Sequence, residues 1–384
     1  MEVIEEVLEN VSSLSNPAEN IKSALSTKLM ALSFINISEL SRISGVSKPN
    51  ISKYFKAHPQ LSVQRNNNRI VGVTPDSAEQ FLIDHMITHF KKGAVVLVGN
   101  CCGGVGKTSA SLNLACAARR VVALDSPIVL ADGDPQGSFT SMVFGKPAND
   151  SESILIDFLS GKATINDILT PIGNNMWFVK SNLNQIYLDK LIDKPKEIKS
   201  AMSHFYQEIF RKLGPKTKIF QDHTPQLSSL LASSICGIHQ LPTDIIKAIV
   251  IPMRSDVTAI RGADYVLLEI EELSETFSFS SNIDVHCVLS GLDNRVKSIT
   301  RDGLKIIADH QNIVNNLSNV VIRYSSELSR CINNSQENES SNKRGHINVF
   351  SRGKMNNAGE DYQDLLDSIF DKSSFATSSN LGGQ

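Results

Sequence analysis

The chain lacks several features that would assign it to a specialised class of protein. No run of apolar residues approaches the ~20 that a membrane-spanning helix needs, and the acidic start MEVIEEVLEN has no basic region ahead of an apolar segment. Net charge is almost absent, because 38 Lys and Arg face 40 Asp and Glu. This balance excludes a uniformly basic nucleic-acid binder. We therefore expect a protein that is neither exported nor membrane-bound, with any basic surface confined to one segment.

Cysteine is also scarce, and its spacing is not that of a metal or redox motif. The six cysteines contain no CxxC pair, and several lie in apolar runs, where reduced thiols are common. This pattern is typical of a protein of the reducing cytoplasm. The remaining composition is 41% hydrophobic and 20% charged over 384 residues. A chain of this length and composition predicts two or three globular domains.

Residues 1–32 carry apolar residues at helical spacing, with a break near Asn16 and Pro17. Two interpretations remain open. These helices either pair with a second copy of the chain or pack on the domain that follows.

Residues 33–91 predict a small DNA-binding domain. A first helix begins after Asn36 with the pattern of a capping box, and Gly45 provides a tight turn. A second helix then begins after Ser47 as its cap, with Pro49 in the first turn, where proline costs little. Two helices joined by a glycine turn at this spacing are typical of a helix-turn-helix.

A block of basic residues coincides with this domain. Between Ser41 and Pro75 there is no Asp or Glu, although six residues are Lys or Arg. Alternating apolar and polar residues from Leu61 to Val73 surround an Asn-rich turn and predict a β-hairpin wing. Neutralised phosphates release counterions, so a basic block of this kind indicates DNA; a small helical domain with a solvated basic face is the alternative. The residues that we expect at the DNA are Ser47, Lys48, Asn50, Ser52, Lys53, Arg65 and Arg69.

A nucleotide site is predicted at residues 94–118. A buried parallel strand runs into a glycine-rich loop and then a helix, which is the context of a P-loop. In such a loop the backbone N–H groups cradle the phosphates, Lys107 reaches the β- and γ-phosphates, and Thr108 binds Mg²⁺. The general pattern GxxxxGK[ST] fails at Cys101, where it requires glycine. The residues expected to hold ATP or ADP are Gly103, Gly104, Val105, Gly106, Lys107, Thr108 and Ser109.

Carboxylates follow two further apolar stretches, at Asp132 and Asp134 and again at Asp222. The carboxyl ends of parallel strands form the ligand-binding edge of a doubly wound sheet. We expect Asp134 to orient or deprotonate the attacking water, Asp132 to support the metal shell, and Asp222 to hold Mg²⁺ through water. Turn capping is the alternative for any one of them. Residues 92–384 are therefore predicted to form an α/β P-loop domain with a doubly wound, mostly parallel sheet.

These motifs resemble the ParA/SopA family of partition ATPases, which has a deviant Walker A loop. The family's KGGVGKT, DxDPQG and DxxP are similar to residues 102–108, 132–137 and 222–225. The resemblance covers about residues 30–372 and is closest to long members with an N-terminal helix-turn-helix. It implies an ATP-dependent homodimer in the cytoplasm that coats nucleoid DNA without sequence preference. A ParB-type centromere-binding partner would stimulate hydrolysis, and the helix-turn-helix would repress the partition operon at its operator.

One position departs from the family pattern. The signature lysine, which reaches the partner's phosphates across the dimer, falls at Cys102, and a neutral thiol cannot supply that charge. A nucleotide-gated transcriptional repressor with negligible turnover is therefore the alternative function. A membrane-cycling relative of MinD type is disfavoured because residues 371–384 are small and polar. Iron–sulfur chemistry is disfavoured because the adjacent cysteines lack further ligands.

A polar segment rich in Asn and Ser near residues 332–346 predicts an exposed loop. Its second half and the residues that follow are basic, with Lys343, Arg344, Arg352 and Lys354. This stretch is a candidate surface for non-specific DNA contact, and a solvated loop with scattered charge is the alternative.

Overall fold

The computed structural model describes residues 35–86, 92–121, 126–173, 175–279, 283–292, 304–326, 348–350 and 357–378. The helices predicted within residues 1–32 and the polar loop near 332–346 lie outside these ranges. No helix in the described part of the chain combines the length and apolar character required to cross a membrane.

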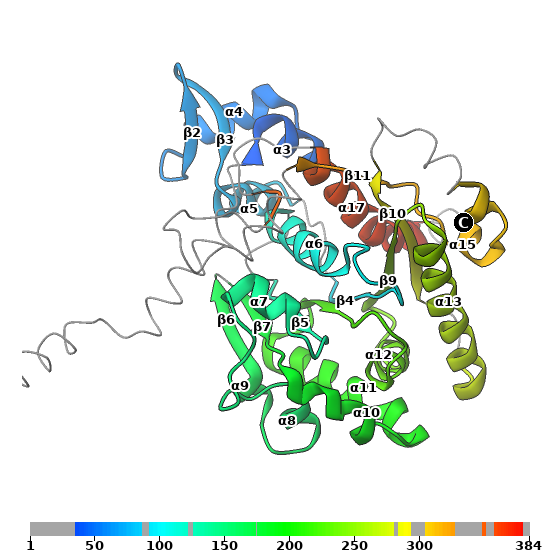
Figure 1. Cartoon of the computed structure of the whole chain (residues 1–384). Helices are drawn as coiled ribbons and strands as arrows, with labels where there is room; N and C mark the ends of the chain where they lie inside the picture. The colour runs from blue at the N-terminus through cyan, green and yellow to red at the C-terminus, as the bar shows by residue number, and fades with distance from the viewer. Residues whose placement is uncertain are drawn as a thin grey trace, which may run out of the picture.

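An eight-stranded sheet forms the centre of the larger domain (Figure 1). All neighbouring strands are parallel except β6 and β7, which form an antiparallel hairpin at one edge. Buried strands of a parallel sheet appear in sequence as continuous apolar runs. The two predicted strands β4 and β8 lie at the centre of the sheet. The spatial order is β11 (Ile322–Arg323), β10 (Asp284–Leu292), β9 (Ile246–Met253), β4 (Ala94–Val98), β8 (Lys218–Asp222), β5 (Ile128–Asp132), β7 (Met176–Val179) and β6 (Leu169–Gly173).

Helices cover both faces of this sheet, which confirms the predicted α/β P-loop architecture. One face packs on α6 (Lys107–Val121), α7 (Ser138–Phe144) and α17 (Asn357–Ser378). The other packs on α11 (Pro195–Leu213), α12 (Ser229–His239) and α13 (Val257–Phe277). Shorter elements complete the domain: α8 (Leu155–Leu159), α9 (Ile165–Ile168), η1 (Leu183–Tyr187), α10 (Leu188–Leu191) and α15 (Gln311–Asn315).

A small domain precedes the sheet. Its helices are α3 (Ile37–Ser44), α4 (Lys48–Ala57) and α5 (Pro75–Asp84), and its strands β1 (Ile35–Asn36), β2 (Val63–Asn66) and β3 (Arg69–Val73) pair in the order β1-β3-β2. The hairpin turn contains Asn67 and Asn68, both with positive φ, the conformation that tight hairpins need. The core of this domain is apolar and includes Leu40, Phe55 and Phe81.

The helix ends predicted for this domain agree in part with the structure. The Asn36 side chain caps α3 as predicted, because Oδ1 accepts a hydrogen bond from the Glu39 N–H at 2.7 Å. Gly45 ends that helix in the left-handed conformation. Ser47 occupies the N-cap position of α4, as predicted. Its side chain makes no capping hydrogen bond. Strand β1 was not predicted, since two residues carry no periodicity.

The small domain contacts the larger one through α5, which packs against α6. The Asp76 carboxylate lies 3.4 Å from the buried guanidinium of Arg119, near the C-terminal end of α6. The helix that begins at the predicted phosphate loop therefore ends against the small domain.

Candidate nucleotide-binding site

The glycine-rich loop joins the carboxyl end of β4 to the first turn of α6 (Figure 1). Gly104 and Gly106 have φ values of 70° and 94°, a conformation that other residues adopt only with strain. No atom outside the loop lies within 4 Å of the position that a Cβ would take at Gly103 or Gly104, so the loop backbone is open to a ligand. Open backbone at a helix N-terminus is suited to phosphate.

Asn100 anchors this loop to the neighbouring strand and helix. Its buried amide donates to the Pro252 and Ala259 carbonyls at 2.9 and 3.2 Å, and its Oδ1 accepts from the Cys102 N–H at 2.7 Å. Gly262 of α13 makes the close approach possible, because a Cβ there would lie 2.4 Å from Asn100 Oδ1. The position of Cys102 is thus set by α13 as well as by the loop.

Lys107 begins α6 and is almost fully buried. Its ammonium donates to the Cys102 carbonyl at 2.8 Å. Burial lowers the pKa of Lys107, and the carboxylates of Asp222 and Asp134 oppose that shift. A nearby anion stabilises the charged form of a buried lysine. A phosphate group bound beside Lys107 would be such an anion.

Thr108 and Asp222 lie together although 114 residues separate them. The Thr108 hydroxyl donates to Asp222 at 2.6 Å, and Ser111 donates to the other carboxylate oxygen at 3.3 Å. Burial raises the pKa of Asp222 to about 8, so the ionised form needs a cation beside it. A hydroxyl next to one carboxylate is a ligand pair suited to Mg²⁺, which takes its remaining ligands from phosphate and water. The described residues contain no cluster of three or more His, Cys, Asp or Glu that could hold a metal alone.

Asp132 lies at the carboxyl end of β5, as predicted, and its carboxylate makes hydrogen bonds with the loop that follows. Its carboxylate is buried and accepts hydrogen bonds from the N–H and hydroxyl of Thr140, at 2.7 and 2.6 Å, and from the Asp134 N–H at 3.0 Å. Burial raises its pKa to about 6. Asp132 therefore fixes the loop after β5, and its support of the metal shell stays a prediction.

A cavity of about 460 Å³ brings most of the predicted residues together, a size usual for small-molecule sites. Gly103, Gly104, Gly106, Lys107, Thr108, Ser109 and Asp134 all line it. Val105 does not, because its side chain is buried in the core. Sequence reasoning missed Gln136, Ser138, Ser141, Met142, His223 and Pro225, although four of these lie within or beside the motifs that were recognised. Open loop backbone, a buried cation and a hydroxyl–carboxylate pair fit a nucleotide with Mg²⁺.

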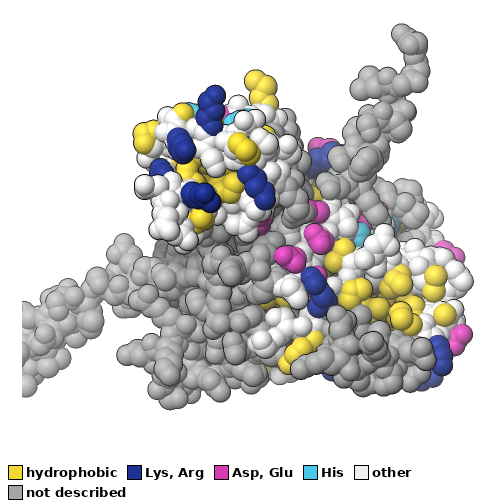
Figure 2. Space-filling view, turned by 90° about the horizontal axis from the view of Figure 1, so that it is seen from above, with side chains coloured by type: hydrophobic (Ala, Val, Ile, Leu, Met, Phe, Trp, Pro, Cys, Tyr) yellow, Lys and Arg dark blue, Asp and Glu magenta, His cyan; other side chains and the backbone are white. Residues whose placement is uncertain are grey.

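The residues predicted at DNA lie mostly on the surface of the small domain. Ser47, Lys48, Asn50, Lys53, Arg65 and Arg69 are exposed, and Ser52 is half-buried. Asn50 and Lys53 line one hollow beside Tyr54 and His58. Figure 2 shows Lys and Arg side chains gathered over this domain. The surface is thus basic and accessible.

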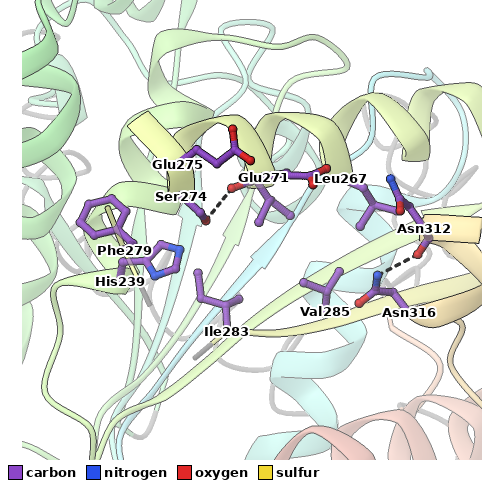
Figure 3. Close-up of a pocket in the computed structure, with 11 residues that line it drawn as sticks. His239, Leu267, Glu271, Ser274, Glu275, Phe279, Ile283, Val285, Asn312 and Asn316 are labelled. Carbon is purple, nitrogen blue, oxygen red and sulfur yellow. Dashed lines mark hydrogen bonds between the residues drawn. The ribbon is translucent and has the colours of Figure 1, made fainter. Parts of the chain in front are cut away.

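A second cavity, of about 660 Å³, lies between α13, α15 and the start of β10 (Figure 3). Its floor is apolar, with Ile283 and Val285, and the carboxylates of Glu271 and Glu275 lie at its rim. None of the described residues that line it is Lys or Arg, and none belongs to the glycine-rich loop. It therefore lies apart from the predicted nucleotide site.

The fold and the site define a P-loop nucleotide-binding protein. A family model described as an AAA domain matches residues 93–285, which is half of the chain, so the chain belongs to this family of P-loop ATPases. The chain is also similar to the "Chromosome partitioning protein ParA" of Caulobacter vibrioides. The two are 24% identical over 221 residues, which cover 56% of this chain and 76% of the relative.

Solved structures share the fold at low sequence identity. One named "Partition Protein" is 12% identical with a TM-score of 0.56, covering 96% of this chain and 98% of its own; this likeness extends beyond the P-loop domain. A complex of a Cyanothece McdA variant with ATP is 14% identical with a TM-score of 0.55, covering 73% and 96%. Cobyrinic acid a,c-diamide synthase from Mycobacterium smegmatis with ADP and magnesium is 16% identical with a TM-score of 0.53, covering 73% and 96%.

Proposed function

We propose that the protein is an ATP-dependent DNA partition protein of ParA type that binds and hydrolyses ATP with Mg²⁺. The observation that carries this proposal is the contact of 2.6 Å between the Thr108 hydroxyl and the Asp222 carboxylate, beside buried Lys107. Gly103, Gly104, Gly106 and Ser109 would hold the phosphates. Thr108 and Asp222 would hold the metal, which neutralises charge on the phosphates when bound.

Asp134 is the residue best placed to act on water. It follows Asp132 at the carboxyl end of β5 and lines the cavity together with Lys107. One of its oxygens accepts from the Gln136 N–H at 2.8 Å, which orients the carboxylate. A carboxylate in this position can orient or deprotonate a water for attack on the terminal phosphate.

Nucleotide-dependent dimerisation is supported by apolar side chains beside the site. Leu183, Ile186 and Tyr187 of η1 are exposed by 67%, 62% and 53%, and Leu227 by 47%. The elements that follow these residues are linked, because the Ser229 N–H at the start of α12 donates to Asp189 of α10 at 2.9 Å. Leu227 also follows Pro225, which lines the nucleotide cavity. Exposed apolar residues gathered in this way indicate a protein interface, and a second copy of the chain is the partner that we propose.

The small domain is proposed to bind operator DNA as a winged helix-turn-helix and to repress the protein's own operon. Its α4 presents Asn50 and Lys53, while Arg65 and Arg69 lie on the hairpin. A ParB-type protein and non-specific nucleoid DNA are the further partners, and the cytoplasm, on the nucleoid, is the proposed location. The similarity to a partitioning protein supports these proposals.

The test is ATP hydrolysis by the purified chain, alone and with DNA and the product of an adjacent small DNA-binding gene. We expect hydrolysis to rise when both are present. The alternative, a nucleotide-gated repressor with negligible turnover, is favoured by one observation, which is that Cys102 stands at the position of the signature lysine. ATP binding with operator binding, but with no stimulated hydrolysis, would reject the partition ATPase and support that alternative.

A further inference from the structure

His223 is a buried histidine in the wall of the nucleotide cavity. Its side chain is 1% exposed, and it lines the cavity with Lys107, Thr108 and Asp134. Neither ring nitrogen has a hydrogen-bond partner among the residues that the structure describes. Buried polar groups in native proteins nearly always have a partner. The partner of this ring is therefore to be sought in what the cavity binds.

The backbone around His223 is fixed. Its N–H donates to the Val98 carbonyl at 3.1 Å, and the preceding Asp222 carbonyl accepts from the Gly133 N–H at 2.9 Å. The residue is thus held between the carboxyl ends of β4 and β5. Only its side-chain torsions are left to aim the ring.

The ring can donate a hydrogen bond to a ligand. An imidazole carries at least one N–H donor in each of its protonation states. A nucleotide brings phosphate oxygens, which accept hydrogen bonds strongly and donate none. The donor of the ring and the acceptors of the ligand are therefore complementary.

We propose that His223 donates a hydrogen bond to the terminal phosphate group of the bound nucleoside triphosphate. The proposal rests on the proposed function, because it assumes that the cavity binds nucleotide. It also gives the cavity a donor in addition to Lys107 and the loop backbone, in a chain where Cys102 replaces the signature lysine of the related pattern. His223 would be a donor supplied within the same chain.

Direct binding measurements test the proposal without relying on turnover. Affinities for ATPγS and for ADP, each with Mg²⁺, are measured by calorimetry for the wild type and for His223→Ala, His223→Asn and His223→Gln. We expect His223→Ala to weaken ATPγS about tenfold or more while ADP changes by less than about twofold, since only ATPγS has the terminal group. Asn or Gln should restore binding, because each keeps an N–H donor, and the better of the two identifies the donating nitrogen.

The matched control is His204→Ala. His204 is an exposed histidine that stacks on Phe158, with ring centroids 5.3 Å apart, and its loss should change neither affinity. If His223→Ala leaves ATPγS affinity unchanged, the ring only packs and the proposal is wrong. If ADP and ATPγS weaken equally, the residue positions Asp222 and does not contact the terminal phosphate. If the wild type binds neither nucleotide, the proposed function itself is wrong. The wild-type measurement therefore separates this outcome from a failure of the His223 proposal.

Discussion

Replacing Gly262 with alanine places a methyl group in the contact between α13 and the phosphate loop. The new Cβ would lie 2.4 Å from Asn100 Oδ1 and 2.9 Å from the Cys102 nitrogen, so the Asn100 side chain must move. Overpacking of this kind costs about 1–3 kcal/mol, and the gain in helix propensity returns about 1 kcal/mol. We expect a net loss of about 0–2 kcal/mol in the free energy of unfolding.

The larger effect is expected on nucleotide affinity. Moving Asn100 removes the acceptor of the Cys102 N–H, a hydrogen bond of 2.7 Å that contributes about 0.5–1.5 kcal/mol. The phosphate loop would then have to be ordered by the ligand. ATP affinity should fall about tenfold, which corresponds to about 1.4 kcal/mol. Calorimetric titration with ATP and Mg²⁺ gives the affinity, and urea unfolding gives the stability.

Gly237→Ala provides the matched control. A Cβ at Gly237 would lie 2.8 Å from the Ser203 nitrogen, where α12 packs on α11 and away from the phosphate loop. It should destabilise the fold to a similar degree and leave ATP affinity within about twofold. Equal loss of affinity in both variants would refute the argument, because it would show that general destabilisation, rather than the Asn100 contact, controls the loop.

Two further predictions concern DNA binding and pH. Lys53→Ala should weaken operator binding and lower the salt dependence of the affinity by about one counterion, with ATP affinity unchanged; operator titrations at several salt concentrations check this, and an unaltered salt slope would place Lys53 away from DNA. Because the pKa of Asp222 is raised to about 8 in the fold, the folded state retains a proton that the unfolded chain releases near pH 4. Protonation of Asp222 therefore contributes to the free energy of unfolding. This contribution is complete below about pH 4 and is lost as pH rises through about 8. In urea unfolding without Mg²⁺, stability should therefore decline over this range less steeply in Asp222→Asn than in the wild type, and identical slopes would contradict the assignment.

Contiguous motifs could be predicted from sequence because their chemistry depends on local spacing. The loop from Gly103 to Ser109 needs only one strand before it and one helix after it. Asp222 could be placed as well, because the carboxyl ends of parallel strands meet at one edge, and Asp132 and Asp222 are direct neighbours in the register. The α/β sheet followed from apolar runs of strand length.

Contacts between distant segments could not be predicted in this way. The packing of Gly262 on Asn100 joins residues 162 positions apart, and no periodicity reports it. The position of Asp132 at a strand end could be read from the sequence, whereas the Thr140 groups that donate to its oxygens depend on the path of the loop. His223 was overlooked because its significance arises from burial without a partner, which only the folded structure shows.

The central claim is that residues 103–109 bind the phosphates of ATP, and Lys107 tests it most directly. Calorimetric titration with ATP and Mg²⁺ compares the wild type with Lys107→Ala, after far-ultraviolet circular dichroism has shown that both are folded. Loss of a charge-assisted hydrogen bond of about 1.5–3 kcal/mol should reduce affinity about tenfold to a hundredfold. Unchanged ATP affinity in folded Lys107→Ala would contradict the site assignment.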